Sequence, residues 1–518
     1  MANLSKITAF AQGRSPVVAL VLGSVLVYIV VNLLQWAIIA RRRSLFARKH
    51  GCKPAPRYPH RDPIGLDVSL ENLKMSKQGG FLEFATKRFQ IVGANTFKIM
   101  LLGEHFFVTR EPENMKAILA TQFKDFSFSP SRKEALGDIF GHGIFTTDGK
   151  EWEASRALLR PSFTRSQVGD IETFDKHVTK LLAKIPLDGS TVDLQVLFFG
   201  LTLDSATDFL FGESTDVLRE GGSESGERFA KAFTYVTEQA GIRGRAGKLS
   251  YFIRDKRYPE EKKFVYEYVG NYVQKAVQLH KSSLNQEKKT EDAKSSRYVF
   301  LEHLATTGYS EKKIQDELLN ILLAGRDTTA SLLSFLFYIL ARRPDVFEKL
   351  RAEVTNLGDK PPTFEEIKSM KYLQYCLNEA LRLHPIVPQN ARMAVRDTTI
   401  PLGGGPDGKS PIFVKAGQTV AYSVYAMQRR KDLYGEDAEE YKPERWEHIR
   451  PGWQFLPFNG GPRICIGQQF ALTEASYTTI RLLQTFKSIQ RRDDSILTEY
   501  LTLTAAVRDG VNVALTPA

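Results

Sequence analysis

The sequence predicts a mainly α-helical domain with small β-sheets, an α+β class, preceded by one N-terminal membrane-spanning helix. Three observations support this prediction. An uncharged apolar run lies near the amino terminus, helical periodicity dominates from about Phe81 to Leu279, and short β-type runs separated by Gly and Pro follow Ala391. Hydrophobic residues make up 42% and charged residues 25% of the 518-residue chain, which is typical of a protein that buries a core.

The amino terminus is predicted to be a membrane anchor. After a short tail of residues 1–16, residues 17–39 form a run without charge that is long enough, as a helix, to cross a bilayer. Arg41, Arg42 and Arg43 follow directly, so the positive-inside rule places the downstream chain in the cytoplasm. A cleaved signal peptide is the alternative, but the run is too long and the basic cluster lies on its carboxyl side.

Residues 40–67 are predicted to be a basic, proline-rich linker. Its four prolines, at positions 54, 56, 59 and 63, fix φ and lack amide donors, which excludes a helix between Gly51 and Asp67. We therefore expect a stiff spacer between the anchor and a single domain of residues 68–518.

Periodicity and capping residues predict the elements of this domain. A long apolar helix is expected from Ser310, an N-cap candidate, through Leu340, and Pro344 marks the next helix start. This helix is too apolar for the surface, so we expect it to cross the core. The other predicted elements are a strand-like stretch at 95–109, helices at 167–185, 229–246 and 468–486, and an exposed polar loop at 281–296.

Charge and cysteine content narrow the function classes. The formal charge of +12 suits nucleic acid, an anionic membrane or an acidic protein partner, but no nucleic-acid-binding motif is present. The three cysteines, Cys52, Cys376 and Cys465, are odd in number and widely spaced, so a disulfide framework is not expected. We interpret Cys52 and Cys376 as small buried hydrophobic residues.

Cys465 lies in the glycine-rich turn Phe458-Asn-Gly-Gly-Pro-Arg-Ile-Cys-Ile-Gly467, directly before a helical run. The positive end of a helix lowers a thiol pKa and favours the metal-binding thiolate. The glycines, including Gly461 and Gly467, permit a tight loop and close approach of a flat cofactor, and Arg463 suits a carboxylate. A buried structural cysteine after a turn is the alternative interpretation.

A second polar set, Ala324-Gly-Arg-Asp-Thr-Thr329, lies midway along the long central helix. Gly325 loosens the backbone, and Thr328 can donate its hydroxyl into the helical hydrogen-bond ladder. Asp327 and Thr328 supply an acid and an alcohol, which are costly in an apolar helix unless they are satisfied or used. A simple kink or cap is the alternative.

Two further pairs have helical spacing. Glu379 and Arg382 lie three residues apart and can form an ion pair, although such pairs are usually ordinary surface features. Trp152 and Arg156 lie four residues apart and share one helical face. Neither pair predicts a function without further context.

The cysteine turn resembles the haem-binding loop of the cytochromes P-450. Five fixed positions carry the resemblance, namely Phe458, Gly461, Arg463, Cys465 and Gly467. It implies the cytochrome P-450 fold and a haem b whose axial iron ligand is the Cys465 thiolate, which donates electron density that assists O–O cleavage.

The other sets resemble segments of the same family in the same chain order. Ala324–Thr329 resembles the oxygen-activating motif, which implies that Asp327 and Thr328 relay protons through water to dioxygen. Pro443-Glu-Arg-Trp446 resembles the segment whose arginine, here Arg445, completes a buried structural triad with Glu379 and Arg382. The resemblance also implies contacts to the haem propionates from Arg463, Arg392, Arg156 and Trp152.

Finer features resemble the fungal n-alkane and fatty-acid hydroxylases, family fifty-two. They include Leu203-Asp-Ser-Ala-Thr-Asp-Phe-Leu-Phe-Gly-Glu-Ser214 and Gly467-Gln-Gln-Phe-Ala-Leu-Thr-Glu-Ala475. This implies insertion of one oxygen atom from O2 into a C–H bond of a hydrophobic substrate, at a terminal or near-terminal carbon of an alkane or fatty acid. Ala324 stands where animal fatty-acid ω-hydroxylases carry a haem-esterifying glutamate, so no covalent haem link is expected.

Electrons must come from a partner, because the chain has no Gly-rich flavin or nicotinamide fingerprint. The resemblance implies a separate NADPH-cytochrome reductase and an anchor in the endoplasmic reticulum membrane. Three alternatives stay open: oxidation of a polyketide or other secondary metabolite in a fungal pathway, a non-oxidative haem-thiolate isomerase or dehydratase, and a non-catalytic haem-binding protein.

Overall fold

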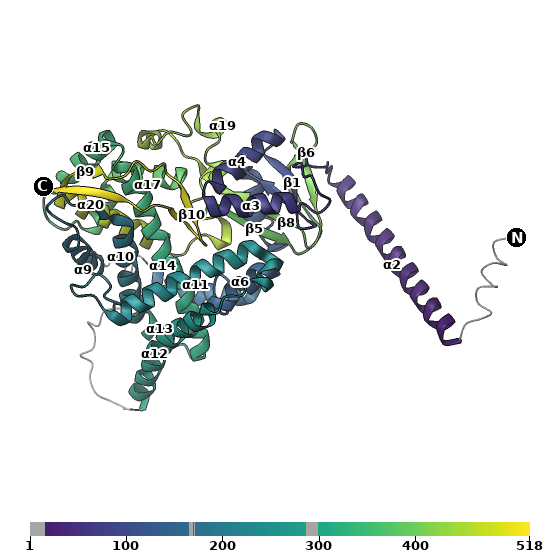
Figure 1. Ribbon diagram of the computed structural model, residues 1–518, viewed down its shortest axis with the longest axis horizontal. Coiled ribbons are helices and arrows are strands. Elements are labelled where there is room, and N and C mark those ends of the chain that lie inside the picture. The colour runs from purple at the N-terminus through teal and green to yellow at the C-terminus, as the bar shows by residue number, and fades with distance from the viewer. Residues whose placement is uncertain (1–15, 165–168, 170, 286–298) are drawn as a thin grey trace.

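The computed structural model describes residues 16–164, 169, 171–285 and 299–518. A large helical body carries small sheets at one end, and a single long helix, α2 (Pro16–Lys49), projects from that end (Figure 1). The other helices are α3 Leu66–Gln78, α4 Phe81–Val92, α5 Pro112–Lys116, α6 Pro130–Phe140, α7 Gly149–Leu159, α9 Ile171–Ala183, α10 Leu194–Phe211, α11 Glu224–Ala246, α12 Arg257–Asn285, α13 Phe300–Ala305, α14 Glu311–Leu340, α15 Pro344–Thr355, α16 Phe364–Ser369, α17 Lys371–Leu383, α18 Val424–Met427, α19 Lys431–Tyr434 and α20 Gln468–Thr485.

Helix α2 is longer than the apolar run that predicts it. It passes through the basic cluster without a break and ends at Lys49, so the first part of the predicted linker 40–67 is helical. At its carboxyl end, Arg43 Nε lies 3.0 Å from the Asp397 carboxylate, and the Phe46 ring lies 5.8 Å from that of Phe413. The end of the helix is therefore attached to the body.

The proline-rich segment that follows is extended, as the prolines predict, but it is not a free spacer. The Tyr58 amide donates to the Lys98 carbonyl at 2.9 Å, and the Lys98 amide donates to the Pro56 carbonyl at 2.8 Å. The Lys53 amide donates to the Pro411 carbonyl at 2.9 Å. These bonds add the segment to the sheet end of the body, which corrects the expectation of a separate linker.

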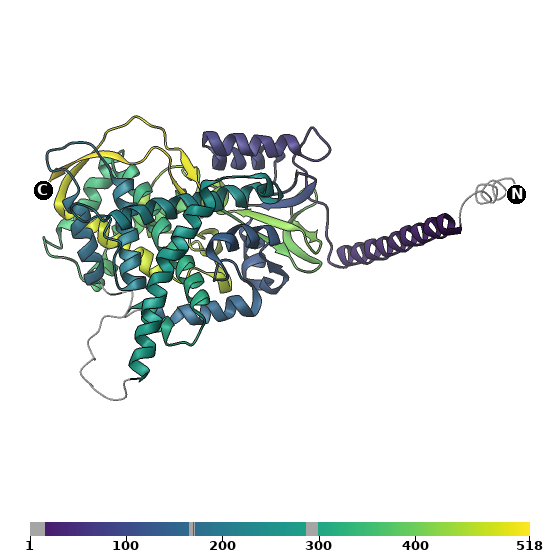
Figure 2. The ribbon, with the colours of Figure 1, turned by 60° about the horizontal axis from the view of Figure 1, so that its bottom comes forward.

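Five strands form the largest sheet, in the order β1-β2-β8-β5-β3. Strand β2 pairs with β1 in an antiparallel hairpin and with β8 in parallel, while β5 is antiparallel to both β8 and β3. These strands are β1 Thr96–Leu101, β2 Glu104–Thr109, β8 Thr419–Ser423, β5 Gln389–Ala394 and β3 Phe126–Ser127. Figure 2 shows this sheet at the end of the body from which α2 leaves.

Three smaller sheets complete the β structure of the described residues. One has three strands in the order β4-β12-β9, and the other two are the antiparallel pairs β6-β7 and β10-β11. The strands are β4 Val192–Asp193, β12 Asn512–Pro517, β9 Phe486–Arg491, β6 Thr398–Gly404, β7 Ser410–Val414, β10 Glu499–Leu501 and β11 Ala505–Val507.

Helix α14 crosses the core, as its apolar sequence predicts. The Ser310 hydroxyl accepts from the Lys313 amide at 3.3 Å and caps its first turn, and most of its later residues are buried. Helix α10 packs against it, and a Cβ added at Gly325 would lie 3.4 Å from the Ala206 Cβ. Gly325 thus permits close helix packing within an unbroken helix, which corrects the expectation that it loosens the backbone.

Most predicted elements are confirmed within a few residues of their expected ends, namely the strand pair at 95–109, the helices at 229–246 and 468–486, and the helix starting at Pro344. The exposed loop expected at 281–296 is wrong at its start, because α12 continues to Asn285; residues 286–298 lie outside the described part. The helix expected at 167–185 is described from Ile171 to Ala183.

Candidate functional site

Cys465 lies three residues before α20, where the turn predicted from sequence closes on itself. Its amide donates to the Phe458 carbonyl at 2.9 Å, and the Ile464 amide donates to the Gly461 carbonyl at 3.0 Å. The thiol keeps accessible surface that a ligand can cover, although protein surrounds it closely. Burial raises the pKa of Cys465, while the Gly467 amide and Arg156 act in the opposite direction. The net direction corrects the expectation from the helix terminus, because desolvation is the larger effect.

Two glycines of the turn have different reasons for being glycine. Gly461 has φ +66°, and a Cβ there would lie 2.0 Å from the Leu119 carbonyl oxygen, so backbone contact alone requires glycine. Gly467 has φ −91°, and a Cβ would lie 3.6 Å from the Phe163 ring, which is an ordinary contact. The described structure therefore does not itself require glycine at position 467.

Two predicted arginines from distant segments, Arg156 and Arg392, lie near the cysteine turn, which itself carries the third, Arg463. Arg156 of α7 donates to the Ile464 carbonyl at 3.0 Å. Arg463 donates to the Thr147 carbonyl at 3.1 Å and pairs with Asp148. Arg392 of β5 is buried and donates to the Asn390 side chain at 3.0 Å.

A fourth arginine, Arg132 in the first turn of α6, belongs to this group and is not among the residues predicted from sequence. It contacts the Asn390 side chain, which also accepts from Arg392, and its Nε is buried without a hydrogen-bond partner among the described residues. One feature of the sequence indicates that Arg132 has an unusual environment. A basic residue in the first turn of a helix opposes the helix dipole, so Arg132 needs an anion nearby to explain it.

The arginine cluster, Arg132, Arg156, Arg392 and Arg463, carries more positive charge than the protein neutralises. Burial together with repulsion from its neighbours lowers the pKa of Arg463 to about 10, and that of Arg132 to about 10. Among the described residues, Asp148 is the one carboxylate that pairs with the cluster, and Lys133 shares it. Such a cluster suits a ligand with two carboxylates, because guanidinium forks bind carboxylates with two hydrogen bonds.

Aromatic side chains cover the guanidiniums. The Arg463 guanidinium lies 4.3 Å from the ring centroid of buried Trp152 and 4.5 Å from that of Phe128. The Arg392 guanidinium also lies 4.5 Å from the Phe128 ring. Trp152 thus acts on the cluster through cation–π contact, and Phe458 packs against the main hydrophobic core.

Glu379, Arg382 and Arg445 meet in the interior. Arg382 forms a two-bond fork with Glu379, both bonds at 2.9 Å, and Arg445 Nε donates to the same carboxylate at 2.8 Å. The Trp446 indole donates to it at 3.0 Å. Arg445 also pairs with Asp437 at 3.2 Å, so two carboxylates face the two guanidiniums, which is the condition under which buried ions persist.

This triad also reaches the cysteine turn. Arg382 Nη1 donates to the Gln428 carbonyl at 2.8 Å, and the Gln428 side-chain oxygen accepts from the Leu456 amide at 2.8 Å. Leu456 precedes Phe458 by two residues, so the network fixes the start of the segment that carries Cys465.

Asp327 and Thr328 lie in the middle of α14. The Thr328 hydroxyl donates to the Ala324 carbonyl at 2.7 Å, as the sequence predicts. Asp327 is buried, and burial raises its pKa, but it is not a solitary acid: Arg326 Nη1 lies 3.0 Å from its Oδ1. The sequence analysis did not assign a role to Arg326.

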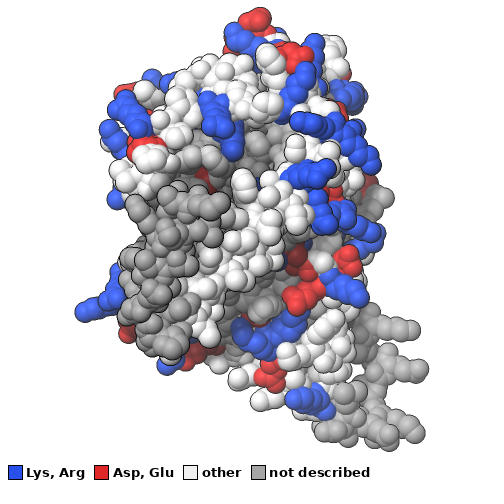
Figure 3. Space-filling model, turned by 90° about the vertical axis from the view of Figure 1, so that its right-hand side faces the viewer, with Lys and Arg blue, Asp and Glu red and all other residues white. Residues whose placement is uncertain are grey.

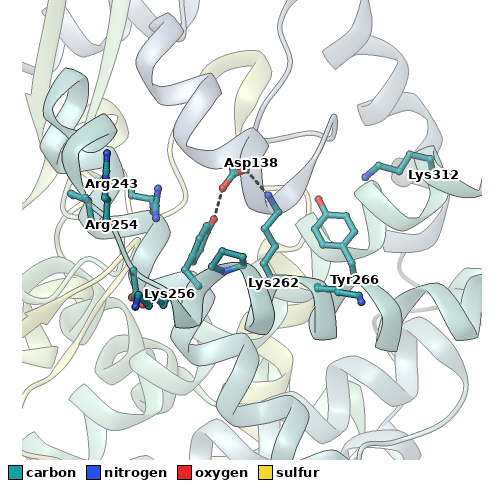
Figure 4. Close-up of a pocket in the computed structure, with 12 residues that line it drawn as sticks. Asp138, Arg243, Arg254, Lys256, Lys262, Tyr266 and Lys312 are labelled. Carbon is teal, nitrogen blue, oxygen red and sulfur yellow. Dashed lines mark hydrogen bonds and ion pairs between the residues drawn. The ribbon is translucent and has the colours of Figure 1, made fainter.

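A cavity of about 850 Å³ opens elsewhere, between α6, α11, α12 and the start of α14 (Figure 4). Asp138 accepts hydrogen bonds there from Tyr258 and Lys262, both at 2.5 Å, and six Lys and Arg residues line the cavity against two Asp. None of the predicted site residues lines it. Its basic lining suits an anionic group and not an apolar chain.

A thiol beside a cluster of guanidiniums fits a haem group, which offers both an iron and two propionates. The chain belongs to the cytochrome P450 family, because the family model described as Cytochrome P450 matches residues 63–509. Family and fold therefore imply haem iron. Relatives named as monooxygenases agree, and this chain is a cytochrome P450 monooxygenase.

Three curated relatives and one solved structure illustrate the similarity. Cytochrome P450 monooxygenase himC of Aspergillus japonicus is 45% identical, over 92% of this chain and 87% of its own. Cytochrome P450 monooxygenase FPY7 of Fusarium mangiferae is 45% identical over 92% of both chains, and Cytochrome P450 52A13 of Debaryomyces hansenii is 42% identical over 94% and 97%. The crystal structure of the cytochrome P450DA heme domain matches the fold with a TM-score of 0.74 at 22% identity, covering 90% of this chain and 98% of that one.

Proposed function

We propose that this monooxygenase hydroxylates a terminal or near-terminal carbon of an alkane or fatty-acid chain. The observation that carries the proposal is the 42% identity to Cytochrome P450 52A13 over nearly the whole of both chains. The reaction takes RH, O2, two electrons and two protons to ROH and water. The haem supplies the binding and reductive activation of dioxygen.

The residues of the chain have separate tasks in this proposal. Cys465 would supply the thiolate that holds the haem iron. The arginine cluster holds the propionates, and the Glu379–Arg382–Arg445 triad keeps the cysteine turn in place. The shortage of carboxylate partners around the cluster supports its role in holding the propionates. The hydrogen bond that the Leu456 amide donates to the Gln428 side chain supports the role of the triad.

Proton delivery is assigned to Asp327 and Thr328. A buried acid with a raised pKa exchanges protons more readily near neutral pH than an ordinary carboxylate does. The Thr328 hydroxyl follows it directly in the helix, and water can join the two groups. An isomerase or dehydratase that uses no oxygen has no need of this acid and alcohol, which favours the monooxygenase reaction.

Membrane attachment and electron supply complete the proposal. Helix α2 is long and apolar enough to cross a bilayer, and the apolar side chains described along its apolar run are exposed. We place it in the endoplasmic reticulum membrane, with the body in the cytoplasm and electrons arriving from a separate NADPH-cytochrome reductase. On the face turned toward α2, Lys and Arg cover more of the described surface than Asp and Glu do (Figure 3), which suits anionic lipid.

A second substrate class has its own support. The relatives himC and FPY7 are more similar, at 45% identity, than Cytochrome P450 52A13 is, and their names do not carry the fifty-two designation. Oxidation of an alkyl chain in a secondary metabolite, such as a polyketide, is therefore the alternative proposal.

A binding screen followed by turnover tests both classes. Purified ferric protein is titrated with n-alkanes, fatty acids and alkyl polyketides of matched length, and displacement of iron-bound water is read from the Soret band. Compounds that bind are incubated with NADPH and reductase, and products are identified by mass spectrometry. Binding and ω-hydroxylation of the alkane or fatty-acid set support the first proposal, whereas oxidation of the polyketides alone contradicts it.

A further inference from the structure

Arg326 joins two helices at the centre of the protein. Its side chain is 5% exposed, and Nη1 donates to the Asp327 carboxylate of α14 at 3.0 Å. Its other terminal nitrogen, Nη2, donates to the Thr234 hydroxyl of α11 at 2.6 Å. Thr234 in turn donates to the Ala230 carbonyl of its own helix at 2.8 Å. A single guanidinium therefore connects the acid of α14 to α11.

Two aromatic rings also lie near the guanidinium of Arg326. Its guanidinium lies 5.1 Å from the Phe199 ring and 5.7 Å from the Phe233 ring. Its Nε is buried without a hydrogen-bond partner among the described residues. A charge in such a place is costly, and removing one member of a buried pair leaves the other uncompensated. The position is therefore not explained as an ordinary surface ion pair.

The electrostatics of Asp327 depend on Arg326. Burial raises the pKa of Asp327, and in the described part of the chain Arg326 is the one cation that opposes this. Glu238 of α11 faces both residues, its own pKa is raised by burial, and it bonds to Tyr500 of β10. Glu474 of α20 faces Thr329, on a neighbouring position of α14. Glu238, Tyr500 and Glu474 thus supply no positive charge to this part of the structure.

We propose that Arg326 is a positioning residue for proton delivery: its guanidinium holds the Asp327 carboxylate beside Thr328 and links it to Thr234 of α11. This inference rests on the proposed proton-relay role of Asp327. Nη1 of Arg326 bonds to Asp327 of α14, and Nη2 bonds to Thr234 of α11. A displacement of α11 therefore changes the restraint on the Asp327 carboxylate. Proton delivery is in this way coupled to the position of α11, whose buried side chains belong to the same hydrophobic cluster as those of α12 and of the first half of α14.

A double-mutant cycle tests whether Arg326 acts through Asp327. Arg326→Gln, Asp327→Asn and the double variant are compared in the full-length enzyme by the share of consumed O2 that leaves as peroxide. We expect each single change to raise this share by about threefold or more, and the double variant to be no worse than Asp327→Asn. Arg326→Lys should restore part of the coupling. Additive effects would overturn the proposal, and so would full activity of Arg326→Gln.

Titration separates positioning from general support of the fold. Because Arg326 opposes the effect of burial, its loss should move the pKa of Asp327 to higher pH. Infrared spectroscopy of the resting protein, without turnover, measures the band of protonated carboxyl groups, and the part that Asp327→Asn removes belongs to Asp327. In Arg326→Gln this band should therefore titrate at higher pH. An unchanged midpoint contradicts the proposal.

Two controls make the outcomes distinguishable. Arg342→Gln breaks a comparable ion pair with Asp493 beyond the end of α14, and it should leave the peroxide share and the infrared midpoint unchanged. Thr234→Val keeps the charge of Arg326 but removes the bond to α11, and it should raise the peroxide share; no change would refute the link between the helices. If Asp327→Asn itself has no effect on coupling, the proton-relay role fails, and this inference fails with it, while hydroxylation in the wild type still stands.

Discussion

Glu474 of α20 offers a test of how a buried acid affects stability. Its side chain is 1% exposed, and neither carboxyl oxygen has a hydrogen bond of ordinary geometry among the described residues, although the hydroxyls of Ser205 and Thr329 face it. Burial raises the pKa of Glu474 from 4.5 to about 8. Glu474→Gln keeps the shape of the side chain and removes the titration.

The magnitude follows from the two pKa values. At neutral pH the unfolded chain ionises Glu474 while the folded protein holds it protonated, and each pKa unit between 4.5 and the working pH is worth about 1.4 kcal/mol. At pH 7 this pKa difference lowers the free energy of unfolding by about 3 kcal/mol. The folded pKa is the raised one, so the stabilising contribution is full below pH 4.5 and is lost as pH rises toward about 8. Since a buried amide also has a cost, we expect Glu474→Gln to gain about 1–3 kcal/mol at pH 7.

Unfolding is followed by circular dichroism in denaturant at several pH values between about pH 5 and pH 8, with the haem-loaded protein. The wild type should lose stability as pH rises, and Glu474→Gln should show a smaller loss. Glu366→Gln is the matched control, because hydrogen bonds to Thr363 lower the pKa of Glu366, and its titration therefore lies below this window. Equal pH slopes in the wild type and Glu474→Gln would refute the reasoning.

Four further outcomes are expected. Cys465→Ser should abolish the carbon-monoxide absorption band typical of thiolate ligation in the reduced protein; an unchanged band would exclude Cys465 as ligand. Thr328→Ala should keep that band and raise peroxide release, measured per NADPH consumed, and unchanged release contradicts the relay. Gly461→Ala should lower the haem content of the purified protein, because its Cβ would collide with the Leu119 carbonyl at positive φ. Arg132→Gln should speed haem loss to apomyoglobin by about tenfold, the effect of one charge-assisted hydrogen bond, while Arg343→Gln, with its exposed ion pair, should not.

Local sequence rules predicted the parts of the protein that local rules control. Ser310 caps its helix as expected, and the turn at Gly461 has the backbone geometry that only glycine adopts without strain. Glu379 and Arg382 share one helical turn, so their pairing follows from spacing alone. The partner of this pair, Arg445, was assigned by family resemblance and lies where that resemblance implies.

The residues that were missed owe their environment to distant segments. Arg132 joins the cluster because α6 lies against β5, and no pattern around Arg132 contains Asn390. Arg326 is buried beside Phe199 of α10 and Phe233 of α11, and no pattern around Arg326 in the sequence contains these residues. The linker was misjudged for a related reason: its prolines predict extended backbone but not the strand edge at Lys98 that pairs with it.

The attachment of α2 to the body has a mechanical consequence. Arg43 and Phe46 lie on a helix that continues unbroken from the apolar run, and they contact Asp397 and Phe413 of the sheet end. For a protein anchored as proposed, rotation of the helix about its axis turns the catalytic body with it. The body then meets an electron donor in the same membrane by lateral diffusion, with its orientation already restricted, and fewer encounters are lost to wrong orientation.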